Sequence, residues 1–193
     1  MLIWLLRHGM TSLGEEKRYQ GRLDTGLSAL GRRALRQAPF QPGRLYISPL
    51  LRAEETAAIL FPEIQPRVAA DLREMDFGAF EGKNWLELEK DGEYRTWVAG
   101  GCLDPCPGGE DKAGYTQRVC AAFEALVEES LSQGETEIAV VAHGGTQMAV
   151  LERWGDDPRE YWQWQRACGC GWLLDTDPWP ERLHVREEVC LTR

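Results

Sequence analysis

The sequence contains no long hydrophobic run. None of its apolar stretches approaches the ~20 residues that a helix needs to span a bilayer. The apolar run Leu2–Leu6 is short, and no small-residue cleavage motif follows it, so it is unlike a secretory signal. Internal repeats and low-complexity segments are also lacking. We therefore expect a cytoplasmic globular protein with no role at a membrane.

Positive charge is also scarce. The 193-residue chain has 22 Lys and Arg against 31 Asp and Glu, which gives a formal net charge of −9. Nucleic acids and anionic membrane surfaces repel such a chain, so neither is expected as the main partner. A small anionic ligand is compatible with this charge, because a local basic pocket can lie within an acidic protein.

The six cysteines follow no strong metal-binding or disulfide pattern. A cytoplasmic protein keeps its cysteines reduced, so we expect small buried or loop thiols. The alternative is a four-thiolate zinc site formed by Cys102, Cys106, Cys168 and Cys170. Their spacings, C-x3-C and C-x-C, are unlike those of known zinc sites, and free thiols are preferred.

Apolar segments alternate with amphipathic segments along the chain. The patterns predict strands at Leu2–Leu6, Arg44–Ser48, Ile138–Ala142, Gly171–Asp175 and Leu183–Val189. They predict helices at Ser28–Gln37, Pro49–Leu60, Tyr115–Leu131, Thr146–Trp154 and Pro158–Gln165. This alternation predicts an α/β fold, a three-layer α/β/α sandwich with a mostly parallel central sheet. Residues 75–114 show little periodicity, and we expect an excursion that covers one edge of a single domain spanning residues 1–193.

Two apolar strands end in the same way. The segment LIWLLRHGMT carries His8 directly after a predicted strand, and IAVVAHGGT carries His143. Both strands are apolar throughout, as central strands buried on both faces are. Ligands of open α/β sheets bind beyond the carboxyl ends of the strands, so neighbouring strands would bring the two imidazoles to one site. The glycine after each histidine permits a sharp turn and the close approach of a ligand.

Two arginines accompany the histidines. Arg7 precedes His8, and Arg52 lies in the first turn of a predicted helix with Ser48 as its cap. A cation is disfavoured at that end of a helix, and a bound anion would explain it. Two arginines and two histidines suit a phosphoryl group. Zinc binding is disfavoured, because a third ligand is missing and the arginines would repel the metal.

Six segments together resemble the histidine phosphatase superfamily, also called phosphoglycerate mutase-like. They are LLRHGMT, YQGRLDTGLSALG, ISPLLRAEETA, LREMDFGAFEG, PGGED and VVAHGGT, in family order from residue 2 to about residue 150. The resemblance implies a phosphoglycerate mutase-like fold and a metal-independent phosphatase without a cofactor. It implies that His8 is the nucleophile, that Arg7, Arg52 and His143 hold the phosphoryl oxygens, and that Glu74 is the general acid and then the base. The implied substrate contacts also include Thr11, Gln20, Gly21 and Gly144.

The chain departs from the family pattern at two positions. Gly14 stands where the family usually has an asparagine that helps to hold phosphate, and Met10 replaces a frequent glutamate. The loss of one neutral hydrogen bond would weaken binding rather than abolish chemistry. Thr11, Ser12 and Gln20 are candidates to replace that hydrogen bond. A low-activity protein that only binds a phosphorylated ligand is therefore one alternative.

The compact layout favours a phosphatase of a small phosphorylated metabolite over a phosphoglycerate mutase-type phosphotransferase, the other alternative. The EMDFGAFEG segment and the strand at Gly169–Leu174 resemble bacterial α-ribazole phosphatases of cobalamin synthesis, which act on α-ribazole 5′-phosphate. In the excursion, Trp85, Tyr94 and Trp97 either stack on a benzimidazole-like base or simply pack on the core. A second aromatic cluster consists of Tyr161, Trp162 and Trp164. These residues belong to the core, to a dimer contact or to the wall of a pocket, and the sequence does not choose among the three. Either a monomer or a homodimer is compatible with the sequence, and His184 is given no role.

Overall fold

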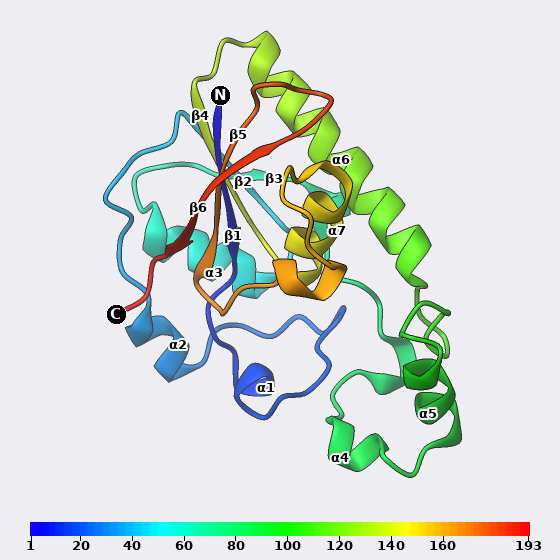
Figure 1. Cartoon of the computed structure of the whole chain (residues 1–193). Coiled ribbons are helices and arrows are strands. Elements are labelled where there is room, and N and C mark those ends of the chain that lie inside the picture. The colour runs from blue at the N-terminus through cyan, green and yellow to red at the C-terminus, as the bar shows by residue number, and fades with distance from the viewer.

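A six-stranded sheet forms the centre of the computed structural model, which describes residues 1–193 (Figure 1). Its order is β3-β2-β4-β1-β5-β6. The strands are β1 (Leu2–Arg7), β2 (Arg44–Ile47), β3 (Arg67–Val68), β4 (Glu137–Ala142), β5 (Cys170–Asp175) and β6 (His184–Cys190). Strands β3, β2, β4 and β1 pair in parallel, whereas β5 pairs antiparallel with β1 and with β6. The predicted α/β class with a mostly parallel sheet is confirmed.

Strand β4 shows why the central strands are apolar throughout. Ile138 and Val140 belong to a core of 28 buried residues that includes side chains of α6 (Lys112–Ser132) and α7 (Gly144–Trp154). Ala139 and Val141 face a second core with α3 (Leu51–Leu60). Successive side chains of a strand point to opposite faces, so a strand covered on both faces is apolar except at its end, where Glu137 begins β4.

The helix predictions are correct for the long helices and wrong at three points. The helix predicted at Ser28–Gln37 is α2 (Ala29–Ala34), because Leu35 becomes extended and bridges to Thr192. Helix α3 begins at Leu51 without a side-chain cap, so Ser48 does not cap it. The helix predicted at Pro158–Gln165 is only the 3₁₀ turn η3 (Tyr161–Trp164), whose aromatic side chains have low helix propensity.

The excursion between β3 and α6 consists of short elements. They are η1 (Ala70–Leu72), η2 (Gly78–Phe80), α4 (Trp85–Leu88) and α5 (Gly92–Ala99). With α1 (Ser12–Glu15), these elements lie beyond the carboxyl ends of the parallel strands (Figure 1). Aromatic packing joins the excursion to the loop after α1, since the Tyr19 ring lies 5.1 Å from that of Phe77 and 6.0 Å from those of Tyr94 and Trp97. The short elements explain why this region lacks a regular pattern in the sequence.

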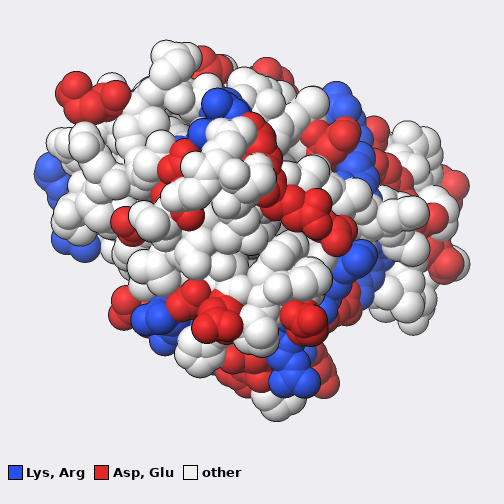
Figure 2. Space-filling view, turned by 90° about the horizontal axis from the view of Figure 1, so that it is seen from above, with Lys and Arg blue, Asp and Glu red and all other residues white.

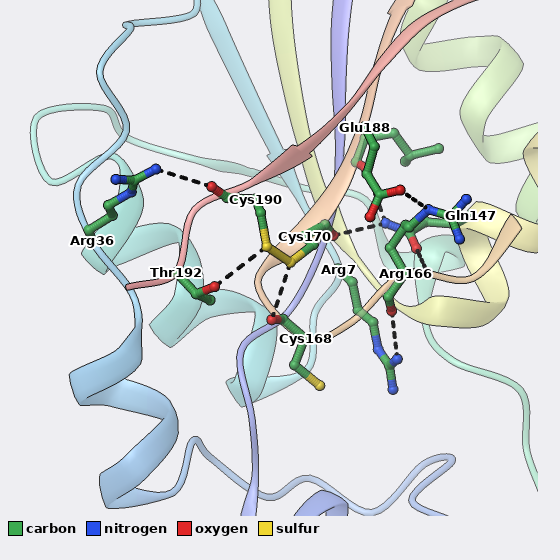
Figure 3. Close-up of a disulfide and its surroundings, with 10 residues drawn as sticks. Arg7, Arg36, Gln147, Arg166, Cys168, Cys170, Glu188, Cys190 and Thr192 are labelled. Atoms are coloured by element: carbon green, nitrogen blue, oxygen red, sulfur yellow. Dashed lines mark hydrogen bonds and ion pairs between the residues drawn. A yellow bond between two sulfur atoms is a disulfide. The ribbon is translucent and has the colours of Figure 1, made fainter.

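Cys170 and Cys190 form a disulfide between β5 and β6 (Figure 3). The expectation of six free thiols is wrong for this pair, which occupies directly opposite positions in the antiparallel register. The zinc alternative is weakened as well, because Cys170 was one of its four ligands. No group of three or more His, Cys, Asp or Glu side chains is placed to hold a metal ion.

The surface and the helices agree with the charge and hydropathy of the sequence. Figure 2 shows acidic and basic side chains interspersed on one face, with no continuous basic stripe. None of the helices combines the length and the apolar character that crossing a membrane requires.

Candidate active site

His8 and His143 meet at the carboxyl ends of two adjacent strands. Strand β1 lies parallel to β4, with Arg7 opposite Ala142, so the residues that follow the two strands are neighbours. The two imidazole rings are 5.3 Å apart between centroids, and both side chains are buried. The sheet topology therefore joins two His-Gly segments that are far apart in the sequence.

The hydrogen bond of His8 defines its tautomer. Its Nδ1 lies 2.7 Å from the Gly9 carbonyl oxygen, which can only accept, so Nδ1 carries the proton. Burial lowers the pKa of His8 well below its ordinary value, and the positive charges of Arg52 and Arg7 lower it further. At neutral pH the ring is therefore uncharged, and its Nε2 has a free lone pair.

The His143 ring is held by Ser48. Its Nε2 lies 2.6 Å from the Ser48 Oγ, which explains the buried serine at a position where the sequence suggested a helix cap. Burial lowers the pKa of His143 well below its ordinary value, with smaller contributions from Arg52, His8 and Arg7. The ring is neutral as well, and its buried Nδ1 has no hydrogen-bond partner in the protein.

Arg7 and Arg52 are cations without a carboxylate partner. Arg52 is fully buried, and its two terminal nitrogens donate to the carbonyls of Gly21 and Leu23, each at 2.8 Å. The Arg7 Nη1 donates to the carbonyl of Arg166 at 2.8 Å (Figure 3). The Nε atoms of Arg7 and Arg52 are both buried and unpaired. Buried charges are normally paired, so the buried Arg52 and the half-buried Arg7 beside the histidines favour an anionic ligand.

Glu74 follows η1 and lines the same cavity as His8. Its Oε1 accepts hydrogen bonds from the Tyr115 hydroxyl at 2.9 Å and from the Met75 amide at 3.0 Å. The other oxygen, Oε2, is left for a ligand. A Cβ atom at Gly145 would collide with Glu74 Oε1 and with the Tyr115 hydroxyl. The second glycine of the HGGT segment thus makes room for the carboxylate and its tyrosine.

The remaining predicted contacts divide into two groups. Gln20 and Gly21 line the cavity, whereas Thr11, His143 and Gly144 do not. Thr11 lies behind the wall, where it accepts from the Gly14 amide and donates to Gln20 Oε1 at 2.8 Å. The amide of Gln20 is thereby oriented by a buried hydroxyl beside the unusual glycine.

The geometry corresponds to a known family. A sequence model described as "Histidine phosphatase superfamily (branch 1)" matches residues 3–182. The chain belongs to the histidine phosphatase superfamily. It is 31% identical over 159 residues to a protein of Hydrogenobacter thermophilus named "Putative phosphoserine phosphatase 2", over 77% of this chain and 76% of that protein.

Solved structures of this superfamily share the complete fold. A crystal structure of phosphoglycerate mutase from Thermus thermophilus is 33% identical, with a TM-score of 0.71 and coverage of 99% of both chains. A structure from Escherichia coli, described as that of "a putative alpha-ribazole-5'-P phosphatase", is 25% identical. Its TM-score is 0.80, and the match covers 100% of this chain and 96% of that chain.

In this histidine phosphatase fold, aromatic side chains line much of the cavity, which has a volume of about 310 Å³. The sequence contains two aromatic clusters but does not show which of their members line a cavity and which are core residues. Trp97, Tyr161 and Trp162 line the cavity, whereas Tyr94 and Trp164 are core residues. Trp85 is exposed and lies outside the lining. The cavity residues that the sequence analysis missed include Arg18, Tyr19, Phe77, Cys102, Lys112, Tyr115 and Gln165.

Proposed function

We propose that this protein is a phosphomonoesterase that works through a phosphohistidine on His8. The observation that carries the proposal is the pair of arginines without carboxylate partners, the half-buried Arg7 and the fully buried Arg52, beside a neutral His8 whose Nε2 is free. Residues 1–193 act as one domain, and the excursion at about 75–114 covers the substrate.

The first step transfers the phosphoryl group from the ester to the protein. The His8 Nε2 attacks phosphorus, and a P–N bond forms as the bond to the ester oxygen breaks. The ester oxygen takes the electron pair of that bond and a proton from Glu74 Oε2, and the alcohol leaves. Arg7 and Arg52 stabilise the charge on the phosphoryl oxygens, and Gln20 adds a neutral donor. His143 is outside the cavity lining, but its ring is 5.3 Å from that of His8 and its Nδ1 has no partner, so it is proposed as a further donor to a phosphoryl group on His8.

The second step returns the protein to its starting state. Glu74, now ionised, takes a proton from a water molecule, whose oxygen attacks the phosphorus of phosphohistidine. The P–N bond breaks, its electron pair returns to the His8 Nε2, and inorganic phosphate leaves. The proton on Glu74 is then available for the next turnover, so atoms and charge balance over the cycle.

The proposed substrate is a small phosphorylated metabolite with a planar aromatic group, such as α-ribazole 5′-phosphate. The support is the aromatic lining of the cavity by Tyr19, Phe77, Trp97 and Trp162, together with the name given to the similar Escherichia coli structure. Aromatic side chains bind planar bases by stacking. A mutase activity is the second candidate, because the similar Thermus thermophilus structure carries that name.

The test is phosphate release from a panel of esters. It contains α-ribazole 5′-phosphate, sugar phosphates, phosphoglycerates, phosphoserine and 4-nitrophenyl phosphate, with His8→Ala as the blank. The proposal predicts release that His8→Ala abolishes, fastest from α-ribazole 5′-phosphate. Isomerised phosphoglycerate without phosphate release would establish the mutase instead. Binding of phosphate esters without turnover would leave only a binding protein.

A further inference from the structure

Glu110, in the PGGED segment, lies outside the cavity and binds two arginines. Its Oε1 accepts from Arg22 Nη2 at 3.1 Å and from Arg118 Nε at 3.0 Å. Its Oε2 accepts from Arg118 Nη2 at 2.8 Å and from the Asp76 amide at 3.0 Å. Both carboxylate oxygens are therefore saturated by charge-assisted or backbone hydrogen bonds, an arrangement that gives a fixed geometry.

The same two arginines donate hydrogen bonds to backbone carbonyls at and just before Glu74. Arg22 Nε donates to the carbonyl of Glu74 itself at 3.2 Å. Arg118 Nη1 donates to the carbonyls of Asp71 at 2.8 Å and of Arg73 at 3.1 Å. The carbonyls before Glu74 and its own carbonyl are thus bound to arginines that Glu110 holds together.

No regular secondary structure holds this loop, although the Phe77 amide farther along it donates to Glu81 Oε1 at 3.1 Å. Glu74 lies between η1 and η2, where neither a helix nor a strand ladder fixes the backbone. The PGGED segment packs against the loop directly: the Glu110 amide donates to the Asp76 carbonyl at 2.9 Å, and a Cβ at Gly109 would collide with that carbonyl oxygen. The backbone of the loop that carries Glu74 is therefore held by side chains outside the cavity lining, in addition to the Tyr115 hydroxyl that binds the carboxylate from within the lining.

We propose that Glu110, Arg22 and Arg118, the Glu110 cluster, form a positioning device that sets Glu74 at the distance required for proton transfer. This inference rests on the proposed role of Glu74 as general acid. The cluster also contacts Tyr115, whose hydroxyl binds the Glu74 carboxylate. The Arg118 guanidinium lies 5.3 Å from the centre of the Tyr115 ring. Its members act through Glu74 and have no contact with substrate.

The test compares two leaving groups in Glu110→Gln. The amide keeps the size of the side chain but loses its charge and one acceptor. An alkyl leaving group needs the proton, whereas 4-nitrophenolate leaves without it. We expect kcat for the fastest alkyl ester of the panel to fall about tenfold to a hundredfold, kcat for 4-nitrophenyl phosphate to fall less than about threefold, and both KM values to stay constant.

Two further variants make the result specific. Glu129→Gln is the matched control, because Glu129 also binds two arginines, Arg44 and Arg67, but its partners do not bind the loop that carries Glu74. It should leave both rates unchanged. The double variant Glu74→Gln with Glu110→Gln should be no slower on the alkyl ester than Glu74→Gln alone, since the second change acts through the first.

The outcomes separate this inference from the proposed function. Equal losses on both esters, no loss, or a multiplied loss in the double variant would overturn the positioning role. If Glu74→Gln itself slows both esters equally, the general acid assignment fails and the positioning role falls with it. Should Glu110→Gln not melt cooperatively, Arg22→Lys provides the same test, because lysine keeps the charge but cannot bridge Glu110 and the Glu74 carbonyl.

Discussion

The two ends of the catalytic cavity are built in different ways. At the inner end, His8 and His143 follow two adjacent parallel strands, and both side chains are buried. At the outer end, Phe77 and Trp97 belong to an excursion of short elements, and Trp162 is 56% exposed on a 3₁₀ turn. The inner end is positioned by sheet hydrogen bonds, and the outer end is positioned by side-chain packing.

In the proposed mechanism, this difference assigns chemistry and selectivity to separate parts of the chain. The sheet would hold the charged groups and the proposed nucleophile rigidly, as phosphoryl transfer requires. Loops and short helices form the wall that meets the rest of the substrate, and such segments vary without disturbing the sheet. Glu74 belongs to neither class, because it lies on a loop whose backbone is bound by Arg22 and Arg118 from outside the cavity, while Tyr115 binds its carboxylate from within the lining.

Gly145→Ala should displace the Glu74 carboxylate, and we expect it to reduce activity more than any other variant described below. Alanine is the better helix former at this position in α7, yet its Cβ would displace the Glu74 carboxylate and the Tyr115 hydroxyl. We expect kcat for alkyl esters to fall on the order of a hundredfold, because a displacement of about 1 Å has that effect on proton transfer. Steady-state phosphate release measures it.

Gly92→Ala is the matched control in the excursion. Gly92 begins α5, and a Cβ there would meet no atom within 4 Å. This variant should keep the wild-type rate and melting temperature. Equal activity of the two variants would show that the packing of Gly145 does not position the carboxylate.

Mild acid, above the pH range in which carboxylates titrate, should lower the free energy of unfolding because of the two buried histidines. Burial lowers the pKa of His8 and of His143 in the folded protein, while the unfolded chain has ordinary imidazoles. The unfolded state then binds more protons below about pH 6.5, so the free energy of unfolding falls as the pH falls through this range. We expect a loss of about 2 kcal/mol between about pH 6.5 and about pH 5.5, measured by urea denaturation.

His8→Gln tests the origin of that loss. With one of the two buried imidazoles removed, about half of the pH dependence should disappear. An unchanged slope would mean that His8 takes up no proton on unfolding, and the neutral, nucleophilic state assigned to it would have no support.

Sequence patterns sufficed where burial alone decides the structure. The apolar runs at residues 2–6 and 138–142 predicted two central strands, because a strand covered on both faces admits few polar residues. The two His-Gly ends then followed from the rule that ligands bind beyond such strands. For these reasons the sequence alone could bring His8 and His143 together.

The missed features depend on which segments meet in space. Ser48 suits a helix cap and a histidine partner equally well, and only the neighbouring strand shows that it binds His143. Cys170 and Cys190 are opposed by the antiparallel register of β5 and β6, which their spacing does not reveal. Tyr115 and Glu110 contact the Glu74 loop through tertiary hydrogen bonds. Glu110 belongs to the PGGED segment, but that segment does not reveal which loop it meets, and Tyr115 belongs to none of the quoted motifs.

Trp162→Ala removes one aromatic side chain from the outer end of the cavity and should have the smallest effect. The indole lines the cavity but is half exposed, so its loss should leave the sheet and the phosphoryl site intact. We expect KM for α-ribazole 5′-phosphate to rise about threefold to tenfold, the amount that one aromatic contact contributes. Inhibition by inorganic phosphate should stay constant, because phosphate occupies only the inner end.

Trp85→Ala is the control for this variant. Trp85 has a similar exposure of 53% but lies on α4, outside the cavity lining, so its loss should leave both constants unchanged. A parallel rise of KM and of the phosphate inhibition constant in Trp162→Ala would show that the outer wall also positions the phosphoryl group. The separation of chemistry and selectivity between sheet and excursion would then be wrong, because one indole at the rim would govern both.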